Sequence, residues 1–188
     1  MDSRAKLLGH PIHQMLIVFP LGLLATAAGF DLVALVRQDG PWSLIAYYLI
    51  AIGVVTGLVA AVFGLVDYLA IPRGTRARYI GTLHGIGNVV VVALFAASWL
   101  LRRPEPSGPA AEALIFSFLG VAIAAGTGWL GGELVNRLGV GVDDGAHLNS
   151  PSSLSGRPAG EGRTIRTFAG PERRHEARAF AGAERRTT

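Results

Sequence analysis

The fold of this chain is decided by four long apolar stretches, of which the second is the clearest. Residues 44–69 read LIAYYLIAIGVVTGLVAAVFGLVDYL, with no charged residue before Asp67. At about 1.5 Å of rise per residue, a helix of about 20 residues crosses the hydrocarbon core of a bilayer. Because lipid offers no partner to an open backbone, separate segments cross it only as helices. The stretch therefore predicts a transmembrane helix.

Three further stretches of similar character lie at residues 12–36, 80–101 and 113–135. Hydrophobic residues make up 51% of the chain and charged residues only 16%, which is more apolar than a soluble domain of this length needs. We therefore expect an all-α fold in which residues 1–142 form a four-helix transmembrane bundle, surrounded by the lipid bilayer.

Small residues recur at four-residue spacing inside these stretches. The clearest series, in the fourth stretch, is Gly120, Ala124, Gly128 and Gly132. Such series let helix backbones approach closely in lipid, which favours a compact bundle. Pro20 removes one backbone hydrogen bond from the first stretch, where we expect a kink.

The first stretch also resembles a secretory signal peptide. Arg4 and Lys6 precede it, and the sequence Ala-Thr-Ala at residues 25–27 resembles a cleavage site. The apolar run nevertheless continues to Val36, and cleavage would remove both histidines near its start. We therefore expect this stretch to be retained as a membrane anchor.

Basic residues predict the orientation of the bundle. Four crossings place both termini and the loop between the second and third helices on one side of the membrane. That side holds Arg4, Lys6, Arg73, Arg76, Arg78 and nine arginines from Arg137 onward, whereas the other holds Arg37, Arg102 and Arg103. The positive-inside rule then places both termini in the cytoplasm.

The composition of the chain changes at residue 143, after which Pro, Ser, Gly and Arg dominate. We expect residues 143–188 to form a disordered, Arg-rich cytoplasmic tail, with a short helix at Pro171–Arg186 as one option. Its arginines either are solvated or contact anionic lipid headgroups. Nucleic acid is not an expected partner, because no aromatic-rich platform or binding motif accompanies the arginines.

Five polar residues near the predicted helix ends fall at one depth of the bundle. The topology gathers His10, His13, Asp67, His84 and Glu133 near the cytoplasmic face. An ionisable group buried in lipid is costly unless it has a partner, so such groups mark functional sites. The sequence therefore predicts a ligand or cofactor site in this layer.

Imidazole is the commonest protein ligand for metals and an axial ligand for haem iron. His13 and His84, from different helices at matched depth, are the expected ligand pair for haem b, with His10 beside them. Asn88 lies one turn from His84 and would orient a ring or a ligand. The chain has no Cys, which excludes iron–sulfur ligation by thiolates and c-type haem attachment within it.

A divalent metal is the alternative to haem in this layer. Asp67 and Glu133 would then join the histidines around zinc, manganese or iron, because mixed nitrogen and oxygen ligands suit these ions. No catalytic Ser/His/Asp set, P-loop or dinucleotide-binding motif is present in the sequence. We therefore assign no catalytic residue and do not predict an enzyme.

The same residues also have purely structural interpretations. Residues near helix ends lie in the headgroup zone, where charge costs little. His10 would then cap the first helix, Asp67 would pair with Arg73, and Glu133 would pair with Arg137 one turn away. Under this interpretation, the chain is a structural or assembly subunit of a membrane complex.

Asp31 stands apart from the layer. It lies 18 residues beyond His13, or about 27 Å along a helix, near the opposite face. Acidic groups at both faces would suit a small transporter or proton relay. Because four helices here show no inverted repeat, such a transporter would require the chain to form a homo-oligomer.

The chain resembles domain-of-unknown-function family 2231, a bacterial membrane family, over about residues 9–142. The resemblance is carried by Gly9-His10-Pro11-Ile12-His13, Phe19-Pro20-Leu21-Gly22, Asp31, Gly64-Leu65-Val66-Asp67-Tyr68, Leu83-His84-Gly85, Asn88, residues 128–133 and Gly139-Val140-Gly141-Val142. It implies four transmembrane helices in the bacterial cytoplasmic membrane and no established activity. Relatives of this kind are joined to Rieske-type or cytochrome-c-type domains, which implies redox surroundings.

The leading functional hypothesis combines the histidine layer with this resemblance. We expect a redox-associated membrane module, non-catalytic or weakly catalytic, that binds haem b or a metal near the cytoplasmic face. It would pass electrons to a redox protein partner.

Overall fold

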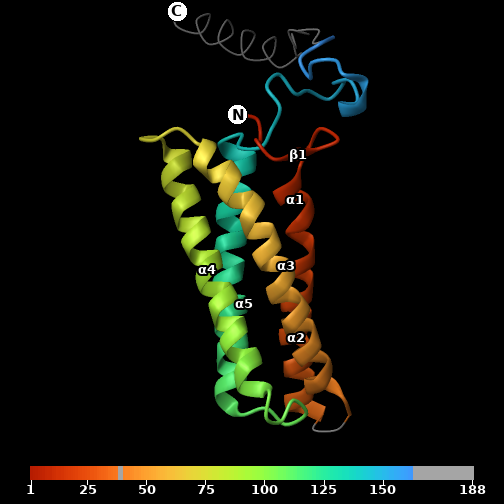
Figure 1. Cartoon of the computed structure of the whole chain (residues 1–188), viewed down its shortest axis with the longest axis vertical. Coiled ribbons are helices and arrows are strands. Elements are labelled where there is room, and N and C mark those ends of the chain that lie inside the picture. Colours follow the sequence, from red (N-terminus) through yellow and green to blue (C-terminus); the bar gives the residue numbers. More distant parts are fainter. Residues whose placement is uncertain (38–39, 163–188) are drawn as a thin grey trace, which may run out of the picture.

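The structure is a computed structural model that describes residues 1–37 and 40–162. Four long helical spans stand side by side in an elongated bundle (Figure 1). The spans are Ile12–Arg37, Trp42–Ala70, Arg76–Arg102 and Ala111–Arg137, and each is long and apolar enough to cross a membrane. The predicted four-helix transmembrane bundle is thereby confirmed, and each span contains the corresponding predicted stretch.

The first span is divided into α1 (Ile12–Leu16) and α2 (Val18–Arg37), which meet at Ile17. Pro20 has no N–H group to donate to the carbonyl oxygen of Leu16, so the regular helical ladder is interrupted there. The break at Ile17 lies three residues before Pro20, and the kink expected at Pro20 stays a prediction.

The remaining spans are α3 (Trp42–Ala70), α4 (Arg76–Arg102) and α5 (Ala111–Gly132). The backbone N–H of Arg78 donates to Thr75 Oγ1 at 3.1 Å, so Thr75 caps α4 and lets it begin in polar sequence. Helix α5 continues as a π-helical turn, η1 (Glu133–Arg137).

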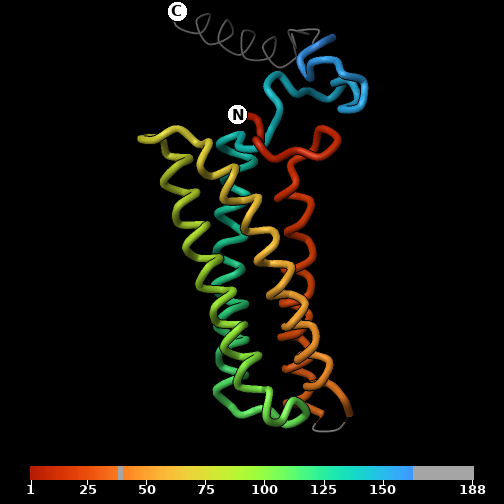
Figure 2. Tube along the Cα trace, in the orientation of Figure 1, coloured from red at the N-terminus to blue at the C-terminus, as the bar shows by residue number. Residues whose placement is uncertain are grey.

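The bundle consists of two helical hairpins. The first hairpin packs α1 and α2 against α3, and the second packs α4 against α5 (Figure 2). Buried side chains from both hairpins form the core between them: Leu24, Ala27, Ala46, Ile50, Val91 and Phe95. Large apolar side chains such as Val55, Leu58 and Val62 are exposed on the outer face of α3, as expected for a surface in contact with lipid.

The N-terminal segment, residues 1–11, folds across the end of the bundle where residues 139–144 emerge (Figure 1). It contains a two-stranded antiparallel ladder of β1 (Lys6–Leu7) and β2 (His10–Pro11). The two strands are joined by Leu8 and Gly9, both with positive φ. The backbone N–H of Gly141 donates to the carbonyl oxygen of Met1 at 2.9 Å. Both ends of the described chain therefore lie at one end of the bundle.

Residues 143–162 form an irregular segment with one short 3₁₀ helix, η2 (Ser153–Ser155). The segment contacts the N-terminal segment through Asp143, which forms an ion pair with Lys6. The rest of the predicted disordered tail, residues 163–188, lies outside the described residues. The predicted short helix at Pro171–Arg186 lies outside them as well.

Candidate ligand site between the two hairpins

His13 and His84, the predicted ligand pair, face each other between the two hairpins. His13 lies on α1 and His84 on α4, and their ring centroids are 6.4 Å apart with perpendicular ring planes. Both side chains are partly buried. The structure therefore brings together two imidazoles that are far apart in the sequence.

A backbone carbonyl holds each ring from the second helix of its own hairpin. His13 Nδ1–H donates to the carbonyl oxygen of Ala60, and His84 Nδ1–H donates to that of Thr127, both at 2.9 Å. A carbonyl oxygen can only accept, so Nδ1 carries the hydrogen in each ring. In the neutral form the lone pair then lies on Nε2 of each ring, which is the tautomer of a metal-ligating histidine with an oriented ring. In His84 this atom has the Asn88 amide 3.2 Å away.

Two glycines make room for the rings. A Cβ on Gly64 would lie 2.8 Å from His13 Cε1, and a Cβ on Gly131 would lie 3.1 Å from His84 Cε1. Side chains at these positions would push the rings away from their carbonyl acceptors. Each imidazole is therefore seated against helix backbone, with Ala60 and Gly64 one turn apart on α3.

Asn88 adjoins the second imidazole. Its Nδ2 donates to the carbonyl oxygen of His84 at 2.8 Å and lies 3.2 Å from His84 Nε2. Thr127 Oγ1 donates to Asn88 Oδ1 at 3.2 Å. Asn88 thus lies where the sequence predicted an orienting residue, while sequence reasoning missed Thr127.

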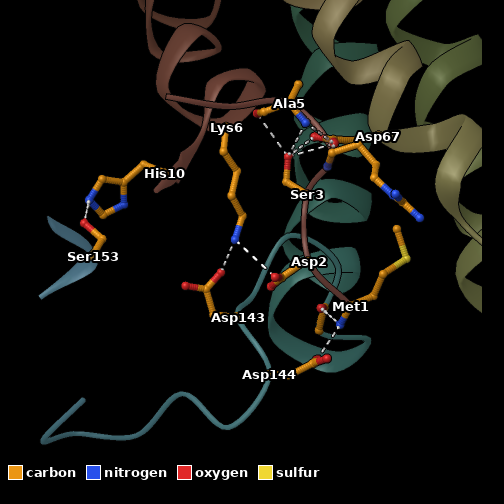
Figure 3. A network of polar contacts seen from close by, with 12 residues as sticks. Met1, Asp2, Ser3, Ala5, Lys6, His10, Asp67, Asp143, Asp144 and Ser153 are labelled. Atoms are coloured by element: carbon orange, nitrogen blue, oxygen red, sulfur yellow. Dashed lines mark hydrogen bonds and ion pairs between the residues drawn. The ribbon is translucent and has the colours of Figure 1, made fainter. Parts of the chain in front are cut away.

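The acidic residues of the predicted layer have other partners. Asp67 accepts hydrogen bonds from the Ser3 hydroxyl at 2.7 Å and from the backbone N–H groups of Arg4 and Ala5 (Figure 3). The structural interpretation that paired Asp67 with Arg73 is therefore corrected. The predicted role of Asp67 as a metal ligand stays a prediction.

Glu133 pairs with Arg76 at 2.6 Å across the α4–α5 hairpin, and not with Arg137 as the structural interpretation proposed. Arg76 precedes the third apolar stretch. It can reach Glu133 because α4 begins at Arg76, directly after its cap residue Thr75. Within the described residues, no group of three or more His, Cys, Asp or Glu is placed to hold a metal ion. The predicted role of Glu133 as a metal ligand likewise stays a prediction.

His10 lies outside the bundle, exposed on β2. Its Nε2 is 3.4 Å from Ser153 Oγ (Figure 3). The cap position of α1 is occupied by Pro11, with no side-chain hydrogen bond in the described chain, so His10 does not cap that helix. The structure therefore separates His10 from the two histidines of the bundle.

Asp31 is fully buried near the opposite end of the bundle, in an ion pair that sequence reasoning missed. Arg102 Nη1 and Nη2 each donate to one carboxylate oxygen of Asp31 at 2.7 Å. The Arg102 guanidinium also donates to the hydroxyls of Ser98 and Ser117. The pair lies about 27 Å from the histidine level, with the buried Phe95 among the apolar side chains between. Asp31 as a proton relay stays a prediction.

The centroid separation of the two imidazoles is comparable with that of two rings bound to one ion, and metal binding stays a prediction. Two metal–nitrogen bonds of about 2.0 Å, with about 1 Å from each nitrogen to its ring centre, separate facing rings by about 6 Å. The observed separation is 6.4 Å. Asn88 Nδ2 lies 3.2 Å from His84 Nε2. Haem b between the two rings stays a prediction.

Residues 9–144, which include all four spans, match the family described as "Predicted membrane protein (DUF2231)". The chain belongs to this family. The match confirms the resemblance seen in the sequence, and the membrane assignment of the DUF2231 family agrees with the four spans. No curated protein and no solved structure matches the chain.

Proposed function

We propose that this DUF2231 protein is a membrane-embedded metal-binding module of redox function, in which His13 and His84 bind one transition-metal ion. The proposal rests on a single observation. Two imidazoles with anchored Nδ1 atoms face each other across the hairpin interface at 6.4 Å. Imidazole nitrogen suits copper, zinc, iron and nickel.

The surroundings favour an ion of low charge. Asp67 and Glu133 are committed to other partners, so no described carboxylate compensates the charge of a cation between the rings. Burying uncompensated charge in an apolar interior is costly, and the cost rises with the charge of the ion. Copper(I) carries one positive charge and accepts two ligands in a line. It is therefore the ion that this pair fits best. Because copper(II) would be disfavoured at the same site, the couple would have a high reduction potential and would accept electrons from a partner.

The experiment is a copper(I) titration of protein purified in detergent under reducing conditions. A chromophoric copper(I) chelator competes for the ion, and elemental analysis gives the stoichiometry. The chain has no Cys, so thiols of this protein cannot account for binding. Wild-type protein should bind one ion per chain, and His13→Ala or His84→Ala should lower the affinity at least tenfold.

The matched control is His10→Ala, because His10 is exposed and separate from the pair. This variant should bind copper(I) like wild type. Equal binding by wild type and His84→Ala, with unchanged helix content and elution volume, would refute the proposal. If wild-type protein shows a Soret band after haem supply and His84→Ala does not, the ligand of the two histidines is haem b and not a metal ion.

A further inference from the structure

The two hairpins carry equivalent residues at equivalent places. His13 and Asp31 are 18 residues apart on the first span, and His84 and Arg102 are 18 residues apart on the third. His13 faces His84 near one end of the bundle, and Asp31 faces Arg102 near the other. The first and third spans therefore meet across the bundle in the same register.

The second helices of the hairpins repeat in the same way. Ala60 and Gly64 hold the ring of His13, while Thr127 and Gly131, at the same spacing, hold that of His84. One further pair of glycines precedes them at matching positions. A Cβ on Gly53 would meet Leu24 at 2.6 Å, and a Cβ on Gly120 would meet Phe95 at 2.8 Å. Leu24 and Phe95 are themselves equivalent, since each lies 11 residues beyond its histidine.

We infer that the membrane region is a tandem repeat of one helical hairpin, and that Asp31 and Arg102 make these hairpins pair only with each other. The first hairpin spans residues 12–70 and the second residues 76–137. Because the repeated positions carry opposite charges, the interface is complementary in one combination. This inference concerns assembly and does not depend on metal binding.

The physics of buried charge gives the pair its selectivity. Both side chains are fully buried, and both guanidinium–carboxylate contacts are 2.7 Å. Two first hairpins would bring Asp31 against a second Asp31, and two second hairpins would bring Arg102 against a second Arg102. Like charges buried together are strongly unfavourable, so mismatched hairpins are rejected.

The partner in question is a hairpin from a second copy of this chain. The charge pair determines whether that hairpin is accepted or rejected. The hairpins are joined by Ile71–Thr75, and five residues extend to about 17 Å. Neighbouring helices pack about 8–10 Å apart, so the connection is long enough for hairpins to exchange between two adjacent chains. Charge then decides which exchange is stable.

The test uses two full-length variants with different affinity tags, Asp31→Arg and Arg102→Asp. Each variant alone carries like charges at the interface. When they are co-expressed, hairpin one of either chain complements hairpin two of the other. Tandem affinity purification in detergent should recover at least ten times more mixed complex from this pair than from two wild-type chains.

A matched pair, Asp31→Arg with Arg103→Asp, places the new acidic residue on the exposed neighbour of Arg102 and should give the wild-type background. The charge-exchanged double variant, Asp31→Arg with Arg102→Asp in one chain, should have the elution volume of wild type and a similar melting temperature. The inference is overturned if the complementary variants co-purify no better than wild type. It is also overturned if the double variant is as unstable as the single ones.

Discussion

At the scale of single residues, the site depends on a missing side chain. Gly64 offers bare backbone to the ring of His13, and the Ala60 carbonyl one turn earlier accepts the Nδ1 hydrogen. A methyl group at Gly64 would lie well inside van der Waals contact with the ring. The position of His13 is therefore set as much by a residue with no functional group as by its hydrogen-bond acceptor.

Gly64→Ala should displace His13 and lower both stability and ion affinity. Overpacking of this kind costs about 1–3 kcal/mol. Tryptophan fluorescence during heating in detergent should show a lower melting temperature, and the copper(I) titration should show weaker binding. Gly22→Ala is the matched control, because nothing lies within 4 Å of its Cβ position. A drop of equal size in Gly22→Ala would show that the loss at Gly64 is not due to the ring.

Lys6 and Asp143 tie the N-terminal segment to residues 143–162. The hydrogen bond from Lys6 lowers the pKa of Asp143 below its ordinary 3.8, and the hydrogen bond to Asp143 raises the pKa of Lys6 above its ordinary 10.5. The lowered carboxyl pKa stabilises the contact above about pH 3.8, and this stabilisation is lost as pH falls through the folded value. The raised pKa of Lys6 stabilises it below pH 10.5, and this is lost at higher pH.

We therefore expect the Lys6–Asp143 contact to open below about pH 3.8 and again well above pH 10.5, while the hydrogen bonds of residues 3–5 to Asp67 hold the rest of the N-terminal segment. Because both groups are partly exposed, the contact contributes less than about 1 kcal/mol. A spin label at Leu7→Cys in this cysteine-free chain would report an increased mobile fraction in both ranges. In a Lys6→Met background, the label should be mobile at neutral pH, and the acid transition of Asp143 should disappear. A label whose mobility is unaffected by Lys6→Met would contradict this assignment.

At the scale of elements, apolar length was sufficient to predict the four helices, whereas polar helix ends were not. Arg76–Tyr79 precede the third apolar stretch, yet they are helical because Thr75 supplies a cap. The break at Ile17 follows from Pro20, because Pro20 has no N–H to donate to the carbonyl oxygen of Leu16 one turn earlier.

The candidate site was predictable only where side chains supply the chemistry. Matched helix depth indicated that His13 and His84 lie near each other, and their ring centroids are 6.4 Å apart. The acceptors on Ala60 and Thr127 are backbone carbonyls. Every residue has such a group, so the sequence does not indicate which ones bind the rings. The partners of Asp67 escaped prediction for a similar reason, because two of them are backbone N–H groups of the N-terminal segment.

At the scale of the whole molecule, Arg102 is the residue whose interpretation changed most. The sequence placed it among the loop charges that follow the third stretch, but it is fully buried against Asp31. The exposed arginines at that end of the bundle are then Arg37 and Arg103 among the described residues. The end that carries the N-terminal segment has more basic residues near the membrane: Arg4, Lys6, Arg73, Arg76, Arg78 and Arg137.

This contrast strengthens the prediction that both termini are cytoplasmic, because the positive-inside rule counts basic residues close to the ends of the spans. Single cysteines in the cysteine-free chain allow a direct test with a membrane-impermeant thiol reagent on intact spheroplasts. Ser107→Cys lies in the exposed loop between α4 and α5, and Leu148→Cys is fully exposed beyond η1. Ser107→Cys should react at once, and Leu148→Cys should react only after the membrane is permeabilised. The reverse pattern would place the histidine pair at the outer face, where its ion would exchange with the periplasm and its redox partner would have to be sought there.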